Sequence, residues 1–361
     1  MYDISDIQNI APFSLAKEEK ERFLSDILWD LTRHHYEHCS EYHRILDAWP
    51  FDITNPVSYS DLPFLPVRLF KEFALRSVDE KDVIKQMTSS GTTGQQVSRI
   101  FLDKETATNQ TKILAKIVSD FIGTQRLPMI ILDTKAILKD RNLFSARGAG
   151  ILGYSIFGAD KIYALDEEMR IDFEALDSFL EKHEGENIFL FGFTFMVWQH
   201  FYKELAKSGR TLDLSKGILV HGGGWKKLID EAVDNHTFKC SLKESCNLSR
   251  IYNFYGMVEQ TGTVYMECEQ GHLHAPVFSD IIIRNPQNFR EVAHGEEGLI
   301  EVVSILPKSY PGHALLTEDS GKILGEDDCP CGRKGKYFSI TGRIKNAEIR
   351  GCSDIYATRF A

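Results

Sequence analysis

The sequence predicts an α/β fold in which a core of parallel strands is followed by a β-rich segment. Four short apolar runs, at 129–132, 188–191, 217–220 and 251–254, each precede a glycine-bearing turn or a helical pattern. Runs of this kind that alternate with helices are typical of strands buried on both faces of a parallel sheet. From position 279 onward the helical pattern fades, and the apolar stretches at 280–283 and 298–303 indicate strands joined by turns.

The first 85 residues are rich in helix formers. Apolar residues recur at helical spacing from Lys17 to Leu31, and they do so again from Glu105 to Ile122. Prolines at positions 50, 56, 63 and 66 interrupt the first pattern before a charged stretch at 68–85. We therefore expect a helical region over 1–85, interpreted as a lid, an α/β core over 86–340, and a hinge with a short tail over 341–361.

Composition narrows the classes of protein. The formal net charge is −10, and no dense cluster of Lys and Arg interleaved with aromatic residues is present, which argues against a nucleic-acid partner. No apolar run reaches the roughly 18 to 20 residues of a membrane span, and the N-terminus lacks the pattern of a signal peptide, so we expect a cytoplasmic protein. Seven cysteines spread over 361 residues favour reduced thiols, a metal site or a nucleophile over a disulfide framework.

A run of hydroxyl and glycine residues at 88–94 is the first candidate site. It comprises Thr88, Ser89, Ser90, Gly91, Thr92, Thr93 and Gly94. Glycines allow positive φ and close approach of the backbone, so successive N–H groups and hydroxyls can converge on a phosphate. The run lacks the Gly-Lys-Ser/Thr ending of a P-loop. A plain flexible turn is the alternative interpretation.

Five features follow one another along the chain: the hydroxyl run, His221-Gly-Gly-Gly224, Tyr255-Gly-Met-Val-Glu259, Asp319 and Gly342-Arg343. In this order they resemble the adenylate-forming superfamily, and within it the acyl-protein synthetase family, the fatty-acid-activating component of the bacterial luciferase fatty-acid reductase. The resemblance covers nearly the whole chain. It implies an acyl-CoA synthetase-like N-terminal domain with a β-rich later segment and a truncated C-terminal subdomain.

The resemblance also assigns roles to residues in the binding of ATP and Mg²⁺. Ser89 to Gly94 would hold the β- and γ-phosphates, and Gly222, Gly223 and Gly224 would lie against the adenine. Tyr255, followed by Gly256, would pack on the base, and Glu259 would hold Mg²⁺. Asp319 would bind the ribose hydroxyls, while Arg343 and Lys345 belong to the hinge, where Arg343 would contact the ribose or a phosphate. Taken alone, Tyr255 is also compatible with a core aromatic residue, and Asp319 with a turn.

Cys352 follows Arg350-Gly351 and resembles the acyl-carrying cysteine of the acyl-protein synthetases. The implied reaction joins a fatty or related carboxylic acid to AMP and then moves the acyl group to this thiol, for delivery to a reductase or another carrier. Tethering favours such a step, and nearby cations lower a thiol pKa. A phenylacetate-type ligase that uses coenzyme A is the first alternative, and a non-catalytic nucleotide-binding protein is the second. The run His221-Gly-Gly-Gly would also fit the oxyanion loop of a serine hydrolase, but this chain has no Gly-x-Ser-x-Gly elbow.

The chain departs from the family pattern at three places. Gln96-Val97-Ser98 stands where Pro-Lys-Gly commonly follows the loop, so the lysine that contacts phosphate is missing. The hinge position that is often Asp is Lys345, and the late catalytic lysine of the superfamily has no counterpart. We therefore expect adenylation to depend on other cations and on Mg²⁺.

Two further sets of residues are candidates for a metal site and for an acyl-binding pocket. Cys268, His272 and His274 form a group of soft ligands, as do Cys329 and Cys331, and together they could close a structural zinc site; surface histidines are the alternative. Phe191, Phe193 and Phe195 follow a predicted strand, at a position that by resemblance faces the acyl substrate, although a filled core would explain them equally well.

Overall fold

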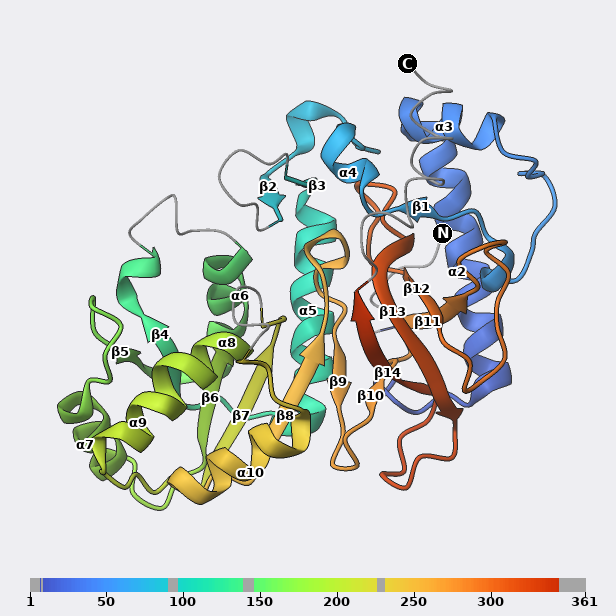
Figure 1. The fold of residues 1–361 in the computed structure, drawn as a ribbon. Helices are drawn as coiled ribbons and strands as arrows, with labels where there is room; N and C mark the ends of the chain where they lie inside the picture. The colour runs from blue at the N-terminus through green and yellow to red at the C-terminus, as the bar shows by residue number, and fades with distance from the viewer. Residues whose placement is uncertain (1–6, 8, 90–96, 139–145, 226–230, 344–361) are drawn as a thin grey trace. The chain divides into compact units, whose positions relative to one another are not determined.

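The computed structural model describes residues 7, 9–89, 97–138, 146–225 and 231–343 (Figure 1). These residues form two compact units. The first unit comprises residues up to Ile117 together with Met257–Tyr265 and the chain from His272 onward. The second comprises Val118–Gly256 and the short segment Met266–Gly271. The division follows contacts in space, whereas the predicted regions followed composition along the chain.

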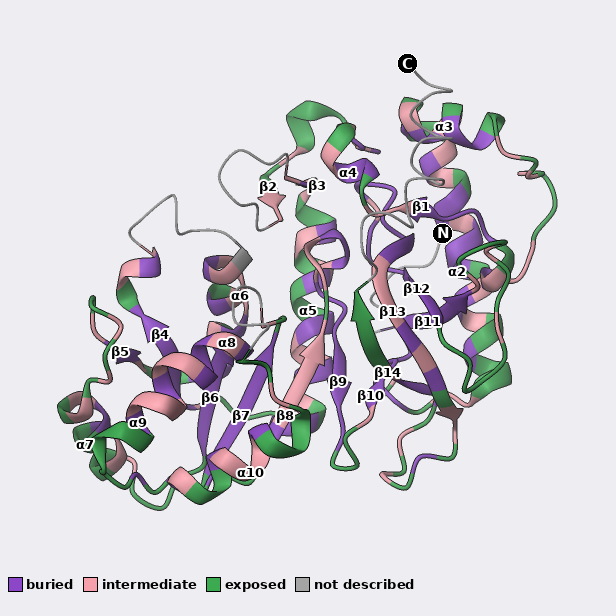
Figure 2. Cartoon of the chain, in the orientation of Figure 1, coloured by how far each residue is buried: buried purple, intermediate pink, exposed green. Residues whose placement is uncertain are grey.

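The second unit is built on a parallel sheet. Its strands are β4 (Leu127–Thr134), β5 (Gly158–Leu165), β6 (Ile188–Phe193), β7 (Gly217–Gly222) and β8 (Arg250–Tyr255), in the order β5-β4-β6-β7-β8. Every neighbouring pair is parallel. The four predicted apolar runs are therefore confirmed as strands, and β4, β6 and β7 are almost entirely buried (Figure 2).

Alternate side chains of β6 point to opposite faces of this sheet. Ile188 and Leu190 belong to a core that they share with α7 (Phe173–Lys182), α9 (Lys203–Ser208) and α10 (Asn235–Cys246). On the other face, Phe191 stacks on Tyr154 of α6 (Ala146–Tyr154), with the ring centroids 4.2 Å apart. A short helical segment, α8 (Thr194–Met196), follows β6 directly. The sheet is thus covered by helices on both faces, which explains its continuous apolar strands.

The first unit contains an antiparallel sheet of β11 (Ser279–Arg284), β12 (Gly298–Ser304), β13 (Ala314–Glu326), β14 (Lys336–Arg343) and the short β10 (Leu273–His274). Consecutive pairs in this order are antiparallel. A two-residue strand, β1 (Leu65–Pro66), pairs parallel with β13. The strand β9 (Tyr265–Glu267) precedes the loop that leads to β10. The β-rich later segment is therefore confirmed.

The N-terminal helices pack on this sheet. The helix α2 (Lys17–His38) is followed by α3 (Ser40–Asp47). Lys20 of α2 contacts Asp280 of β11, with 3.2 Å between Nζ and Oδ1, and both side chains are buried. The predicted helix from Lys17 is thus confirmed and extends further. The charged stretch 68–85 differs from the expected helical pattern, since it holds only α4 (Leu69–Glu72), a 3₁₀ turn at Glu80–Asp82 and the start of β2 (Lys85–Thr88).

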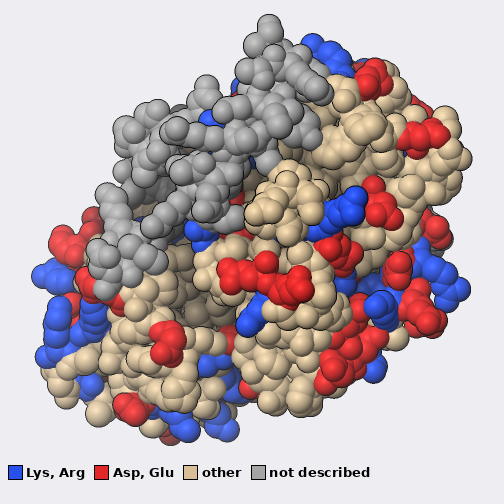
Figure 3. All heavy atoms as spheres, turned by 45° about the vertical axis from the view of Figure 1, so that its right-hand side comes forward, with Lys and Arg blue, Asp and Glu red and all other residues tan. Residues whose placement is uncertain are grey.

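A separate hairpin of β2 (Lys85–Thr88) and β3 (Arg99–Leu102) leads into α5 (Lys104–Ile122), so the second predicted helix is confirmed. No helix among the described residues is long and apolar enough to span a membrane. On the face drawn in Figure 3, acidic and basic side chains are intermixed.

Candidate functional site

The predicted phosphate loop connects the two strands of the β2–β3 hairpin. Thr88 pairs with Arg99 at the end of the ladder. Beyond it, the Ser89 N–H donates to the Ser98 carbonyl oxygen at 3.2 Å, and the Ser98 N–H donates to the Ser89 hydroxyl at 2.9 Å. These bonds close the base of the loop. Ser90, Gly91, Thr92, Thr93 and Gly94 lie outside the described residues, so their predicted contacts with phosphate stay predictions.

Glu259 lies in a short 3₁₀ turn, Val258–Gln260, and its side chain is buried. The neighbouring Gln260 fixes this turn, because its amide nitrogen donates to the carbonyl oxygens of Val302 at 3.0 Å and Gly312 at 2.9 Å. Gly312 is required at this place, since a Cβ there would lie 2.9 Å from the Glu259 carbonyl oxygen. A carboxyl group is thus held rigidly at a defined point of the first unit.

Burial raises the pKa of Glu259, and the nearby Ser98 hydroxyl acts in the opposite direction. Ser98 is itself fully buried, and its hydroxyl lies near the Glu259 carboxyl group without a hydrogen bond of normal geometry to any described residue. The base of the hydroxyl loop and the predicted Mg²⁺ ligand therefore come together, with a hydroxyl and a carboxyl group in a buried setting. A bound cation would offset the cost of ionising Glu259 there, and hard oxygen ligands suit Mg²⁺.

Asp319 and Arg343 are register partners at one end of the β13–β14 ladder. Arg343 Nε lies 3.8 Å from Asp319 Oδ1, and its NH2 group donates to Glu318 at 2.9 Å. The Arg343 side chain is 69% exposed and that of Asp319 26% exposed, so both can reach a ligand. The predicted ribose-binding residues are thus adjacent on one exposed strand end.

In the second unit, the predicted adenine-binding residues lie at the carboxyl ends of neighbouring parallel strands. Gly222 ends β7, and Tyr255 ends β8 next to the exposed Gly256. This edge is where ligands of open parallel sheets bind. Gly223 has a φ of +80°, and a Cβ there would lie 3.1 Å from the Phe193 ring. At Gly222 a Cβ would lie 2.5 Å from the Phe254 ring, whereas Gly224 faces open space.

The histidine before these glycines is a core residue. His221 is buried and stacks on Phe238 with the ring centroids 4.5 Å apart, and its Nδ1 pairs with the Thr194 hydroxyl at 2.9 Å. Burial, followed by the charge of Lys239, lowers the pKa of His221 to about 3. The imidazole is therefore neutral at ordinary pH.

The three phenylalanines of the predicted acyl pocket differ in exposure. Phe191 is fully buried between Tyr154 and Phe254, whereas Phe193 and Phe195 keep part of their surface exposed. Phe193 closes over the glycines at the end of β7, because a Cβ on Gly223 would touch it. The role of all three in acyl binding stays a prediction.

Lys345 and Cys352 lie outside the described residues. Of the five predicted metal ligands, Cys268, His274, Cys329 and Cys331 place their ligand atoms within 4.8 Å of one another. His272 lies beside this group, with its Nδ1 3.4 Å from the Cys329 sulfur.

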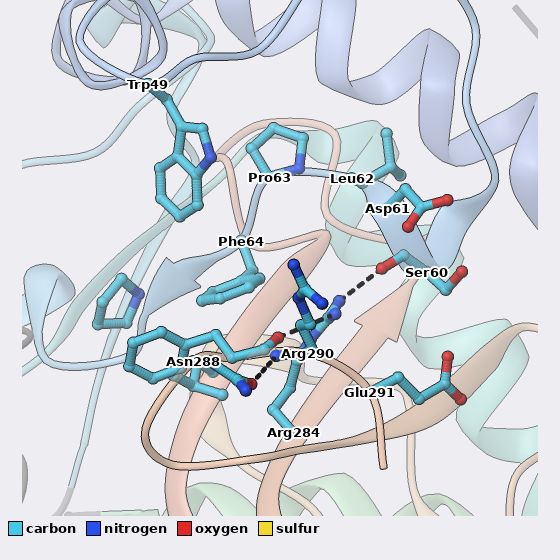
Figure 4. A pocket seen from close by; sticks show the side chains of 13 residues that line it. Trp49, Ser60, Asp61, Leu62, Pro63, Phe64, Arg284, Asn288, Arg290 and Glu291 are labelled. Carbon is cyan, nitrogen blue, oxygen red and sulfur yellow. Dashed lines mark hydrogen bonds between the residues drawn. The ribbon is translucent and has the colours of Figure 1, made fainter. Parts of the chain in front are cut away.

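A cavity of about 520 Å³ in the first unit holds none of the predicted site residues (Figure 4). Trp49, Phe64 and Arg284 line it. The Arg284 guanidinium lies 5.1 Å from the Phe64 ring centre, pairs with Glu301, and donates to the Ser60 carbonyl oxygen at 2.6 Å.

Ser98 is the residue of this site that sequence reasoning did not assign. The sequence marked Gln96-Val97-Ser98 only as a departure from the family pattern. The pairing of Ser89 with Ser98 across the loop brings the Ser98 hydroxyl to Glu259, and a hairpin register was the only signal that could have indicated this.

Solved structures with a similar fold define the class of protein. An open conformation of 2-hydroxyisobutyryl-CoA ligase, in complex with 2-HIB-AMP and CoA, superimposes with a TM-score of 0.69 at 15% identity, covering 96% of this chain and 81% of that one. The same ligase in its thioesterification state gives a TM-score of 0.70 at 16% identity, covering 96% and 74%. The fold is thus that of the adenylate-forming ligases.

The chain belongs to the acyl-protein synthetase family LuxE, whose model matches residues 2–361. Two curated relatives are named long-chain-fatty-acid–luciferin-component ligase. The one from Vibrio harveyi is 24% identical over 356 residues, which cover 95% of this chain and 89% of the relative. The one from Aliivibrio fischeri is 24% identical over 357 residues, covering 95% and 90%. The predicted family and fold class are therefore confirmed, and the family supports acyl activation.

Proposed function

We propose that this protein activates a fatty acid with ATP as acyl-AMP and then transfers the acyl group to its own Cys352. A carboxylate oxygen attacks the α-phosphorus, which forms the acyl–phosphate bond and releases pyrophosphate. The Cys352 thiolate then attacks the acyl carbonyl carbon, which forms a thioester and releases AMP. The thiol proton passes to solvent. The names of the two relatives support a long-chain fatty acid as substrate.

The observation that carries the proposal is the hairpin that closes the base of the hydroxyl loop through Ser89 and Ser98, with the buried Glu259 carboxyl group near the Ser98 hydroxyl. It joins a loop rich in donors to a buried carboxyl group in one rigid unit, as binding of a charged triphosphate requires. Asp319 and Arg343 add an acceptor and a cation on an exposed strand end of the same unit.

Mg²⁺ fits the oxygen ligands of Glu259 and Ser98, and when bound it would offset negative charge on the phosphates. The chain's own contribution is to hold the carboxyl group in place through Gln260 and to exclude water by burying it. Arg343 would bind a ribose or phosphate oxygen at the hinge.

Single-turnover labelling tests the acceptor. The protein is mixed with ATP, Mg²⁺ and radioactive saturated fatty acids of graded chain length, and label on the protein is measured before and after hydroxylamine. We expect a hydroxylamine-sensitive label on the wild type and none on Cys352→Ser. The matched control is Cys240→Ser, because Cys240 is a partly exposed thiol, and this variant should label like the wild type.

Pyrophosphate exchange separates the two half-reactions. Cys352→Ser should keep the exchange that depends on fatty acid, because the cysteine acts only after adenylation. Label that appears on coenzyme A and never on the protein would instead favour the acyl-CoA ligase. Nucleotide binding without exchange for any acid would identify a non-catalytic binding protein.

A further inference from the structure

We infer that Cys268, His274, Cys329 and Cys331 bind a structural Zn²⁺ that fixes the closed end of the β13–β14 hairpin. All four ligand atoms lie within 4.8 Å of one another. The Cys331 sulfur lies 3.4 Å from His274 Nε2. In a tetrahedral zinc site with ordinary bond lengths, a sulfur and a nitrogen ligand are about 3.6 Å apart, so this spacing suits zinc and assigns Nε2 as the ligand atom.

Two turns of matching geometry present the cysteines. In Cys268-Glu-Gln-Gly271, the Gly271 N–H donates to the Cys268 carbonyl oxygen at 2.9 Å, and Gly271 has a φ of +80°. In Cys329-Pro-Cys-Gly332, the Gly332 N–H donates to the Cys329 carbonyl oxygen at 2.9 Å, and Gly332 has a φ of +84°. Such turns require glycine at their last position. The repetition indicates that both loops are shaped to present sulfur.

One backbone N–H group points at a ligand sulfur. The Gln270 N–H donates to the Cys268 sulfur at 3.4 Å. A donor aimed at sulfur stabilises the negative charge that a metal ligand carries. Cys268 belongs to the short segment Met266–Gly271, which the chain joins to the first unit at both ends through Tyr265 and His272. Its position near the other three ligands is thus held by short covalent connections.

Aromatic side chains enclose the ligand group. The Tyr337 ring stacks on His274 with the centroids 5.6 Å apart, and Phe13 meets the same imidazole edge-on at 6.1 Å. Cys268 and His274 have no exposed surface, and Cys329 is 5% exposed. An apolar enclosure of this kind orients the ligands and limits access of water. Three thiolates and one imidazole complete a closed tetrahedral site, which is typical of structural rather than catalytic zinc.

His272 is a neighbour of the site rather than a fifth ligand. It is only partly buried, stacks on Tyr337 at 4.8 Å, and faces the Cys329 sulfur through Nδ1 at 3.4 Å. Since tetrahedral zinc takes four ligands, we assign His272 as a hydrogen-bond partner of the Cys329 thiolate.

The site has a mechanical consequence. Cys329 and Cys331 lie in the loop between β13 and β14, where Glu326 pairs with Lys336 at the near end of the ladder. Asp319 and Arg343 pair at its far end. The strand β10, which contributes His274, is only two residues long, so backbone pairing alone anchors it weakly. A metal would tie β10 to the closed end of this hairpin and so hold the strands that carry the predicted ribose-binding residues.

Metal analysis of the full chain, purified without a metal-affinity tag, tests the inference. We expect about one zinc per chain, and replacement by Co²⁺ should give the absorption of a tetrahedral cobalt–thiolate site. Cys329→Ser and His274→Gln should lose the metal. His272→Gln and Cys240→Ser are the matched controls and should retain it. Zinc release by a mercurial titrant from the folded wild type gives a measurement that does not depend on whether ligand variants fold.

Several results would overturn the assignment. One is wild-type protein that takes up no zinc after it is reduced and dialysed against a zinc solution. Others are a disulfide between two of the three cysteines in protein purified under reducing conditions, and iron bound in place of zinc. Retention of the metal by His274→Gln together with its loss by His272→Gln would also contradict the ligand set. All of these readouts are independent of acyl transfer, so they do not rest on the proposed function.

Discussion

Mild acid should destabilise the first unit through the buried rings of His35 and His313. The rings stack with their centroids 4.8 Å apart, and both residues are buried. The Thr32 hydroxyl donates to the Leu28 carbonyl oxygen at 2.8 Å and therefore accepts the Nε2–H of His313 at 2.9 Å. A second proton on His313 would have to sit on Nδ1, which has no hydrogen-bond partner among the described residues.

Burial, followed by the charge of His34, lowers the pKa of His313 to about 3. Burial, followed by the charge of His313, lowers the pKa of His35 well below its usual value of 6.5. The unfolded chain takes up these protons near its ordinary pKa, whereas the folded chain does not. The stability contributed by the neutral rings is therefore complete above pH 6.5 and is lost as the pH falls toward the folded pKa. Below pH 6.5, each ring changes the free energy of unfolding by about 1.4 kcal/mol per pH unit.

Between about pH 7.5 and about pH 5.5, the two rings should together remove about 3 kcal/mol from the free energy of unfolding. Urea unfolding measures this change. Trp198→Phe and Trp225→Phe leave only Trp29 and Trp49, which belong to the first unit, as fluorescent reporters. His313→Asn should halve the dependence on pH, whereas His294→Asn, at an exposed position, should not change it. Equal pH slopes for the wild type and His313→Asn would refute the reasoning.

Three further predictions concern single positions. Asp280→Asn removes the carboxylate whose oxygens lie 3.2 Å from Lys20 Nζ and 3.6 Å from Lys336 Nζ, and both lysines are buried. It should lower the free energy of unfolding by about 3–5 kcal/mol. A decrease of less than about 1 kcal/mol, measured by urea unfolding, would contradict this. Gly262→Ala should destabilise far more than Gly123→Ala. Both glycines have a φ of +90°, but only at Gly262 would a Cβ lie 2.6 Å from the Gln110 backbone, and thermal unfolding compares them. Glu259→Gln should lower fatty-acid-dependent pyrophosphate exchange about 100-fold or more with little loss of thermal stability, and normal exchange would rule out the assigned role.

The strands and long helices were predictable from the sequence because their side-chain periods are local. The apolar runs at 129–132 and 217–220 became β4 and β7, and helical spacing from Lys17 located the start of α2. The stretch 68–85 was not predictable in this way. Its charged residues have high helix propensity, but the segment forms only α4, a 3₁₀ turn and the first residue of β2.

The sequence by itself determined the order of the candidate residues and their chemical types: the hydroxyl loop, the glycines of β7, Glu259, Asp319 and the soft metal ligands. Only the tertiary structure decided which of them meet. It brought Ser98 to Glu259 through a hairpin register, and it selected His274 over His272 for the cysteine group. The physical reason is that each residue type fixes the chemistry of its own side chain. Which side chains lie near one another depends instead on strand register, since a shift of one residue turns every side chain of a strand to the opposite face.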